Sequence, residues 1–341
     1  MNYRIDRIER ENYAAYLTLV QKTQWGNILL PDEYNDDVWG GVVYEENRIV
    51  GGWVGKYRGN KRFIRIFAKS VYFDAYPTFV SSEYMEKYQL LLIDKMREWA
   101  QQDGIVMLNL THWVRGRNLP YLEKELCATF LVTLPDSEDK QWDLVDNKHR
   151  NRFRKGERNE VEVRVLKGED AIAEMNTLQS LREQTQQHAI KKNANASMLL
   201  KSDNFFRNLF LHTDAELHIG SVAGKPATVA VMLISGETAY YHSGGSDYEL
   251  NRQAGSSTYV FWKAITHYIH LPNVKYLDMG GVPVNPTPDH PAYGVYMFKS
   301  LFGGDYMEFD AGVIVINRFK YKVLSFLLRQ RKLLRLFSKV L

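Results

Sequence analysis

Residues 216–242 read ELHIGSVAGKPATVAVMLISGETAYYH, and this stretch decides the fold of the chain. Three runs rich in β-branched, aliphatic and aromatic residues predict strands at 216–222, 227–234 and 238–242. Turn residues at 223–226, Ala-Gly-Lys-Pro, separate the first two runs. Because strands joined by connections this short pair with one another, the stretch predicts an antiparallel meander.

The segments after the meander predict two helices and two strands in alternation. Apolar residues at helical spacing, such as Tyr259, Trp262 and Ile265, indicate the first helix. In chain order, we expect a helix at 253–269, a strand at 274–279, a helix at 292–301 and a strand at 306–316.

The first half of the chain repeats this order. We expect strands at 38–44, 48–56 and 62–69, a helix at 83–102, a strand at 105–110, a short helix at 117–126 and a strand at 129–134. Self-similarity on this scale predicts a duplicated domain. Each copy resembles a GNAT-like N-acyltransferase fold in its order of elements. The fold class is therefore α/β, with two tandem GNAT-like domains, each a mixed sheet covered by helices.

The bulk composition is compatible with two such domains. The chain has 341 residues, of which 45% are hydrophobic and 25% are charged, a normal globular balance. We expect the first domain at residues 1–150 and the second, with the reaction centre, at 151–316. A net charge of +4 permits anionic partners without requiring them.

Cysteine usage and the N-terminus limit the possible classes of protein. Cys127 is the only cysteine, which excludes an intrachain disulfide and a cysteine-based zinc site. The N-terminus lacks the apolar run of a signal peptide, and no apolar stretch is long enough to span a bilayer. These features predict a cytoplasmic location.

Residues 317–341 form a basic tail that contains no acid. Basic residues alternate there with leucine and phenylalanine, which predicts an amphipathic helix lying on an anionic membrane surface. The protein would then be peripheral on the inner face of the membrane. Docking of the tail on the protein itself or on a partner, and contact with tRNA, are the alternatives.

Lys299 stands alone among aromatic and glycine residues in the segment 293–304, YGVYMFKSLFGG. A lysine that is partly removed from water can face a bound anion or a developing oxyanion. The alternative is a lysine whose apolar stem packs in the core while its ammonium stays in water.

Arg252, Gly255 and Ser256 are candidate ligands for the phosphates of a donor, since they stand at the predicted start of a helix. A helix N-terminus offers unpaired N–H groups and a positive dipole end, and glycine lets a phosphate approach the backbone. An ordinary helix start is the alternative.

The ends of two strands are expected beside that helix. Tyr241 and His242 could bind substrate or move protons, although alternation allows only one of Tyr240 and Tyr241 to face a cleft. Asp278 ends the next strand and could orient an amine. Core packing and the capping of a turn by Asp278 are the alternatives.

A basic segment lies between the two copies. Lys148, Arg150, Arg154, Lys155 and Arg158 crowd it with few intervening acids. This pattern suits contact with RNA phosphates or with a lipid surface, and a solvated helix face is the alternative.

Six motifs spread over most of the chain carry a family resemblance. They are Gln24-Trp25-Gly26, Gln141-Trp142-Asp143-Leu144, Arg150-x-x-x-Arg154-Lys155-Gly156-Glu157-Arg158, Tyr241-His242-Ser243-Gly244-Gly245-Ser246, Tyr276-Leu277-Asp278-Met279-Gly280-Gly281 and Gly294-Val295-Tyr296-Met297-Phe298-Lys299-x-x-Phe302-Gly303-Gly304. With these motifs the chain resembles the Fem family of nonribosomal peptidyltransferases and the related FemAB-like acyltransferases of the GNAT superfamily.

The resemblance implies transfer of an aminoacyl group from charged tRNA to an amine on a peptidoglycan precursor peptide. Phe298 and Lys299 match a Phe-Lys pair at the family's reaction centre, where the lysine stabilises the charge of the tetrahedral transition state. We expect Gly280, Gly281 and Tyr296, which fall in the same motifs, to lie near the substrate.

Two departures from the family pattern leave the acceptor open. Ile28-Leu29-Leu30 stand where several members carry a lysine that grips the precursor's diphosphate, and Thr111-His112 stand in place of an Asp-Pro pair. We expect an enzyme that uses aminoacyl-tRNA or acyl-CoA as co-substrate, without a metal or a tightly bound cofactor. A peptidoglycan precursor, another cell-envelope amine or a small amine remain possible acceptors. A non-catalytic, membrane-associated binding protein with the same fold is the other interpretation.

Overall fold

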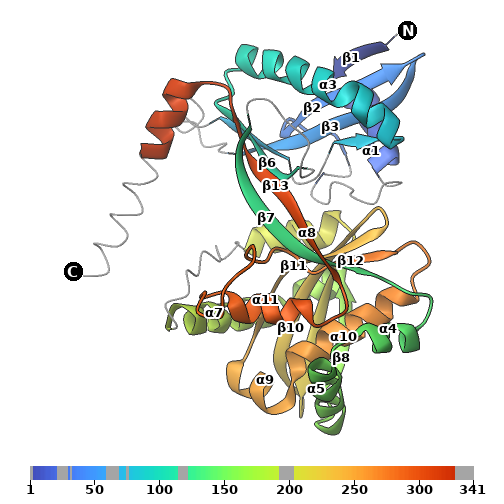
Figure 1. Ribbon diagram of the computed structural model, residues 1–341, viewed down its shortest axis with the longest axis vertical. Helices are drawn as coiled ribbons and strands as arrows, with labels where there is room; N and C mark the ends of the chain where they lie inside the picture. The colour runs from blue at the N-terminus through green and yellow to red at the C-terminus, as the bar shows by residue number, and fades with distance from the viewer. Residues whose placement is uncertain are drawn as a thin grey trace. The chain divides into compact units, whose positions relative to one another are not determined.

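The computed structural model describes residues 3–20, 30, 33–58, 69–73, 77–113, 122–191 and 203–326. The chain forms two compact units (Figure 1). Unit 1 comprises Met1–Leu126 and Phe309–Leu341, and unit 2 comprises Cys127–Glu308.

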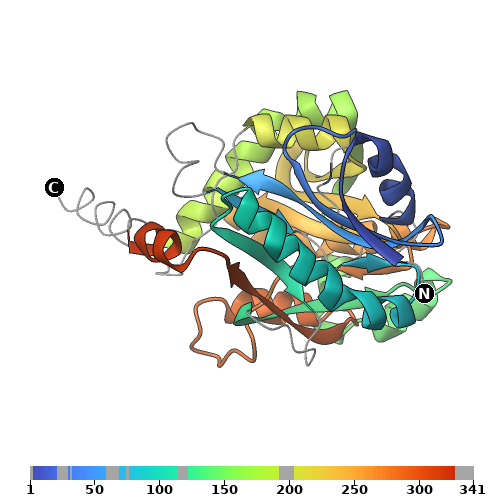
Figure 2. The same cartoon turned by 90° about the horizontal axis from the view of Figure 1, so that it is seen from above.

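Unit 1 contains a mixed sheet. Its strand order is β1 (Tyr3–Arg7), β2 (Val38–Glu45), β3 (Arg48–Arg58), β4 (Ser70–Phe73), β6 (Met107–Trp113) and β13 (Asp305–Val315), and the short β5 (Thr78–Phe79) pairs with β3. β4 and β6 are parallel, and the other neighbours are antiparallel. The helices are α1 (Arg10–Val20) and α3 (Ser82–Gln102), and α3 lies along this sheet against β2 and β3 (Figure 2).

The sequence of α3 explains its position on the sheet. The hydroxyl of Ser81 accepts a hydrogen bond from the N–H of Tyr84 and caps the first turn. Apolar side chains at helical spacing, including Tyr88, Leu92 and Met96, are buried in the core of unit 1. Gly104, with φ at +66°, ends the helix in a left-handed conformation.

Unit 2 repeats the strand order of unit 1. The order is β8 (Glu162–Lys167), β9 (Ala215–Val222), β10 (Lys225–Ser235), β11 (Thr238–Ser246), β12 (Tyr276–Asp278) and β7 (Leu122–Thr133). Here β11 and β12 are parallel and the other neighbours are antiparallel. The predicted duplication of a GNAT-like mixed sheet is therefore confirmed.

Helices cover the sheet of unit 2, with α10 packed on β9 and β10 and α7 packed on β10 and β11 (Figure 1). The helices are α4 (Glu138–Leu144), α5 (Asn147–Arg158), α6 (Gly168–Ala173), α7 (Met175–Lys191), α8 (Asp203–His212), α9 (Tyr248–Ala254), α10 (Ser256–Ile269) and α11 (Tyr293–Ser300). The largest buried cluster of unit 2 includes Phe153, Trp262, Tyr268 and Phe302.

The two copies exchange their last strands. β7 ends the first copy in sequence but pairs with β12, whereas β13 ends the second copy and pairs with β6. As a result, the compact units divide at Cys127 and Glu308 rather than at residue 150.

Two expected elements differ from the structure, and a third is not tested by it. Residues 122–126, expected in a helix, belong to β7, because strand pairing overrides the helical preference of Leu-Glu-Lys-Glu-Leu. The helix expected at 253–269 is split at Gly255, whose φ is +72°. The strand expected at 62–69 lies almost wholly outside the described residues.

The tail is only partly within the described residues. Residues 318–326 are helical, and the rest of the expected amphipathic helix, 327–341, is outside the described part. Among the helices that the structure describes, none is long and apolar enough to cross a bilayer.

Candidate active site

A cleft of about 610 Å³ lies within unit 2. Its walls come from β10, β11, α5, α9, the start of α10 and α11, with one contribution from α7. Of the predicted site residues it brings together Lys299, Phe298, Tyr241, Arg252, Gly255 and Lys155.

Lys299 lines the cleft although only 6% of the residue is exposed. Its ammonium donates 3.0 Å hydrogen bonds to the backbone carbonyls of Gly280 and Gly281 and lies 5.2 Å from the ring centre of Tyr241. No carboxylate of the described residues lies within 4 Å of it. Burial lowers the pKa of Lys299 to about 8, although the negative charge of Asp278 acts to raise it.

Asp278 supports the turn that holds Lys299. Its buried carboxylate accepts hydrogen bonds from the hydroxyl of Thr129 and, at 2.7 Å, from the N–H of Gly280. Gly280 has a φ of +74°, and a Cβ there would lie 2.7 Å from the backbone oxygen of Tyr241. Asp278 therefore caps the turn and is not among the residues that line the cleft.

Tyr241 and His242, which are consecutive in β11, face opposite sides of the sheet, and a β-bulge lies at this point of the strand. The register against β10 places Tyr241 and Ser243 opposite consecutive residues, so His242 is the extra residue. Tyr241 lines the cleft, while the ring of His242 stacks on Phe205, with centroids 5.6 Å apart. Burial raises the pKa of Tyr241 to about 12, which keeps the phenol protonated at neutral pH.

The aromatic residues of α11 fall into two groups. Phe298 lines the cleft and contacts Phe261, with ring centroids 5.3 Å apart. Tyr296 instead packs against Phe130 at 5.2 Å and is not among the lining residues. Phe298 and Phe261 therefore supply the apolar wall beside Lys299.

The N-terminus of α10 borders the cleft, as expected for a donor-phosphate site. Gly255 and Ser257 line it, whereas Ser256 is fully buried and its hydroxyl lies 2.8 Å from that of Thr228. The side-chain oxygen of Asn251 accepts a 2.8 Å hydrogen bond from the N–H of Ser257. Asn251 thus occupies part of the surface that a phosphate would use.

Besides Lys299, three cations from two other helices line the cleft. Arg152 and Lys155 come from α5 and Arg252 from α9, where Glu249 pairs with Arg252 at 2.9 Å. The other cations expected to contact RNA are not among the lining residues: Lys148, Arg150, Arg154 and Arg158.

Arg152 belongs to the basic segment that the sequence singled out, and it lies three residues before Lys155 on the same face of α5. Sequence reasoning missed other residues of the cleft. Asn251 and Phe261 carried no such signal, because their roles depend on how α9 and α10 meet at Gly255.

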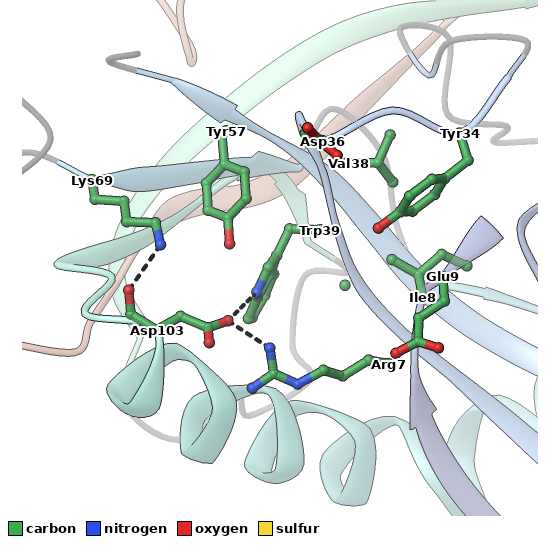
Figure 3. Close-up of a pocket in the computed structure, with 11 residues that line it drawn as sticks. Arg7, Ile8, Glu9, Tyr34, Asp36, Val38, Trp39, Tyr57, Lys69 and Asp103 are labelled. Carbon is green, nitrogen blue, oxygen red and sulfur yellow. Dashed lines mark hydrogen bonds and ion pairs between the residues drawn. The ribbon is translucent and has the colours of Figure 1, made fainter. Parts of the chain in front are cut away.

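A second cavity, of about 330 Å³, lies in unit 1, and two of its cations, Arg7 and Lys69, are bonded to Asp103 at the end of α3 (Figure 3). One carboxylate oxygen of Asp103 accepts hydrogen bonds from Arg7 at 2.7 Å and from the indole of Trp39 at 2.8 Å. Lys69 donates to the backbone oxygen of Asp103 at 2.8 Å. These bonds join β1, β2 and the start of β4 to the helix, so we interpret this cluster as structural.

Within the described residues, no group of three or more histidine, cysteine and acidic side chains is arranged to hold a metal ion.

The chain is similar to known proteins in part of its sequence and in its fold. Residues 145–300 match the family model described as an acetyltransferase (GNAT) domain. The fold is similar to the crystal structure of FemX, with a TM-score of 0.67, 12% sequence identity and coverage of 94% of this chain and 99% of that one. No curated protein matches the chain in sequence.

Two lipid-related structures are also similar. The C-terminal domain (DUF2156) of a putative lysylphosphatidylglycerol synthetase from Agrobacterium fabrum has a TM-score of 0.51 and 14% identity, with coverage of 79% of this chain and 81% of that one. L-PGS from Bacillus licheniformis has a TM-score of 0.51 and 10% identity, with coverage of 83% and 85%.

The family match begins just before α5 and ends with α11, and it therefore contains almost the whole cleft. The likeness to FemX extends over both units. Residues 145–300 thus match an acetyltransferase (GNAT) domain model, in a chain whose fold is similar to that of FemX.

Proposed function

We propose that the protein transfers an aminoacyl or acyl group onto an amine in the cleft of unit 2, with Lys299 as the stabiliser of the oxyanion. One observation carries this proposal. The ammonium of Lys299 is buried at a cleft wall and is held by two neutral carbonyls, and it forms no ion pair within 4 Å among the described residues. A preorganised cation in such a place is suited to stabilising a negative charge that develops during reaction.

The chemistry needs little else from the protein. The amine nitrogen attacks the carbonyl carbon of an ester or thioester, and a C–N bond forms while the carbonyl oxygen becomes an oxyanion. The C–O or C–S bond then breaks, the leaving group takes up a proton and the amine gives one up. Phe298 and Phe261 exclude water from one side of Lys299, which strengthens its interaction with the oxyanion.

Aminoacyl-tRNA is the donor that we favour. Arg152, Lys155 and Arg252 present cations along the cleft, as a polyanion requires. The N–H of Ser257 is already bonded to Asn251, which leaves the N-terminus of α10 less open to a compact pyrophosphate. Acyl-CoA is the alternative donor, supported by the position of α10 at the cleft.

A binding assay with two variants distinguishes these donors. Arg152→Gln combined with Lys155→Gln should weaken binding of charged tRNA and reduce its dependence on salt, while Lys148→Gln on the same helix serves as the matched control. If acyl-CoA is the donor, Asn251→Ala should instead strengthen its binding, because the N–H of Ser257 becomes free. Tight binding of acyl-CoA without binding of tRNA would contradict the favoured donor.

For the acceptor we propose an amine on a peptidoglycan precursor peptide, on the basis of the Fem-like motifs around Asp278 and Lys299. Another cell-envelope amine or a small amine is the alternative. Mass spectrometry of precursor peptides incubated with enzyme and charged tRNA tests this acceptor, and a mass increase of one aminoacyl residue is the expected result.

We also propose that the basic tail binds an anionic membrane surface. Residues 318–326 are helical, with Phe319 and Phe326 exposed to 75% and 60%, and they contain three cations and no acid. Exposed aromatic rings beside cations suit the headgroup region of an anionic leaflet. The enzyme would then act in the cytoplasm at the inner face of the membrane.

A further inference from the structure

The C-terminal end of α11 is held by the segment 141–149. The last carbonyls of a helix have no partner within the helix and must find one elsewhere. Three carbonyls at and just after the end of α11 are bound by this segment: Phe298 O by His149 Nε2 at 2.8 Å, Leu301 O by the N–H of Asp146 at 3.0 Å, and Phe302 O by Gln141 Nε2 at 2.8 Å.

These contacts are buried and closely packed. Gln141 and His149 are both 0% exposed, and the ring of His149 lies edge-on to Phe302 with centroids 4.4 Å apart. Gly303 follows with a φ of +83°, and a Cβ there would lie 2.8 Å from the side chain of Leu144. The chain that leaves α11 therefore has little freedom to shift.

His149 acts on the peptide that carries Lys299. The carbonyl that it binds belongs to the bond between Phe298 and Lys299. From there the lysine side chain reaches the carbonyls of Gly280 and Gly281, so the residue is fixed at its backbone and at its ammonium.

Both side chains keep one buried polar atom without a partner among the described residues: Oε1 of Gln141 and Nδ1 of His149. Buried unpaired atoms cost stability, and an apolar side chain of similar shape would avoid that cost. Purely structural packing does not explain two such residues at one helix end, whereas a need to orient the helix end does.

We propose that Gln141 and His149 are positioning residues for the transfer, which hold Lys299 at the cleft through the carbonyls at the end of α11. The inference rests on the proposed role of Lys299. Neither residue lines the cleft. His149 also lies one turn before Arg152 on α5, so the same helix presents a cation to the donor and supports Lys299.

The donor role requires a proton on Nε2 of His149, which one tautomer of the neutral ring and the protonated ring both carry. Burial lowers the pKa of His149 to about 4, although the carbonyl of Phe298 opposes this shift. Arg152 and Asp146 are the charged groups that act on its ring, in opposite directions. The ring is therefore neutral in the neutral pH range, and the contact with Phe298 O assigns its single proton to Nε2.

Three variants and one control test the proposal in the full-length protein. His149→Phe and Gln141→Met remove the donors with little change in volume, and His149→Gln restores an N–H near the position of Nε2. Gln89→Met, at a buried glutamine of α3 in unit 1, is the control for loss of stability alone. The melting temperature is measured for each variant.

Two readouts separate positioning from packing. The first is kcat and the donor KM of the transfer. The second is the rate at which an amine-specific acetylating reagent modifies Lys299, followed against pH by mass spectrometry. We expect His149→Phe and Gln141→Met to lower kcat by about ten- to a hundred-fold with an unchanged donor KM. We also expect the pH at which Lys299 modification is half-maximal to move up from about 8 towards the ordinary pKa of lysine. His149→Gln should restore both kcat and this pH.

The outcomes distinguish this inference from the proposed function. The positioning role would be overturned if a folded Gln141→Met variant had only a lower melting temperature. Its kcat, and the pH midpoint of Lys299 modification, would then be unchanged. A shifted midpoint with normal transfer would uphold the positioning of Lys299 and refute its role in the reaction.

Discussion

The backbone carbonyl of Gly280 accepts a 3.0 Å hydrogen bond from the ammonium of Lys299, and the backbone at Gly280 has room only for glycine. Its φ of +74° is unfavourable for other residues, and an added Cβ would lie 2.7 Å from the carbonyl oxygen of Tyr241. The turn after β12 therefore fixes the orientation of the lysine.

Gly280→Ala should displace this turn and lower kcat by at least about ten-fold, because the ammonium loses its preorganised position. Gly224→Ala is the matched control: Gly224 has the same φ of +74°, but a Cβ there would meet nothing within 4 Å. We expect the control to lose about 1 kcal/mol of stability with normal turnover. Equal turnover in the two variants would show that the turn does not control Lys299.

The pH dependence of transfer should report the ionisation of Lys299. Burial lowers the pKa of this lysine to about 8, so its charge is present below that pH and disappears above it. If the charge stabilises the oxyanion, kcat/KM falls about ten-fold per unit above pH 8. A rate that instead rises through pH 8 would indicate that the neutral amine is the active form.

Glu216 should make the stability of unit 2 sensitive to acid. Burial alone would raise its pKa, but hydrogen bonds from His218, His267, Tyr268 and Lys167 lower it well below the ordinary value. The ionised Glu216 contributes to the free energy of unfolding above about pH 4.3, its pKa in the unfolded chain. This contribution is lost as the pH falls towards the lower pKa of Glu216 in the folded protein. Burial lowers the pKa of His218, so stability should already decline below the unfolded value of about 6.5.

Thermal unfolding between pH 7 and pH 4 tests this cluster. Glu216→Gln should reduce the free energy of unfolding at pH 7 by about 2–4 kcal/mol and weaken the dependence on acid. Glu237→Gln removes the partner of the exposed Lys275 and, as a control, should cost less than about 1 kcal/mol. A melting temperature of the unmodified protein that does not change over this range would contradict the assignment.

The tail should bind vesicles that contain anionic lipid. Truncation after Asn317 should abolish flotation with phosphatidylglycerol vesicles, and binding of the intact chain should weaken as salt is added. Vesicles of neutral phosphatidylcholine are the control. Equal flotation of the truncated and intact proteins would place any membrane contact elsewhere.

Local patterns in the sequence predicted most of the elements but not the exchange of β7 and β13. Alternation and helical spacing depend on neighbouring residues, and they identified β9 to β11, α3 and α11. Pairing partners depend on the whole sheet, and nothing near Leu122 or Asp305 indicates which copy each strand will join. The strands β1 and β8 are short and have few apolar residues, so their sequences gave only a weak signal.

The sequence predicted those residues of the candidate site whose residue type alone indicates their chemistry. Lys299 was identified because a lone lysine among aromatic residues is unusual, and the structure places it in the cleft. The bulge of β11 at His242 and the hydrogen bond from the N–H of Ser257 to the side chain of Asn251 arise from backbone geometry. Neither follows from residue types or their spacing.

Single-turnover transfer by Lys299→Met, with melting temperature measured alongside, tests the central claim most directly. Removing the buried charge relieves its desolvation, while the carbonyls of Gly280 and Gly281 lose a donor. These effects oppose each other, so we expect stability to change by less than about 1 kcal/mol. Transfer should fall by about a hundred- to a thousand-fold, and Lys299→Arg should restore little because its planar head differs in shape. Near-normal transfer by a folded Lys299→Met variant would contradict the account and make Lys299 a packing residue.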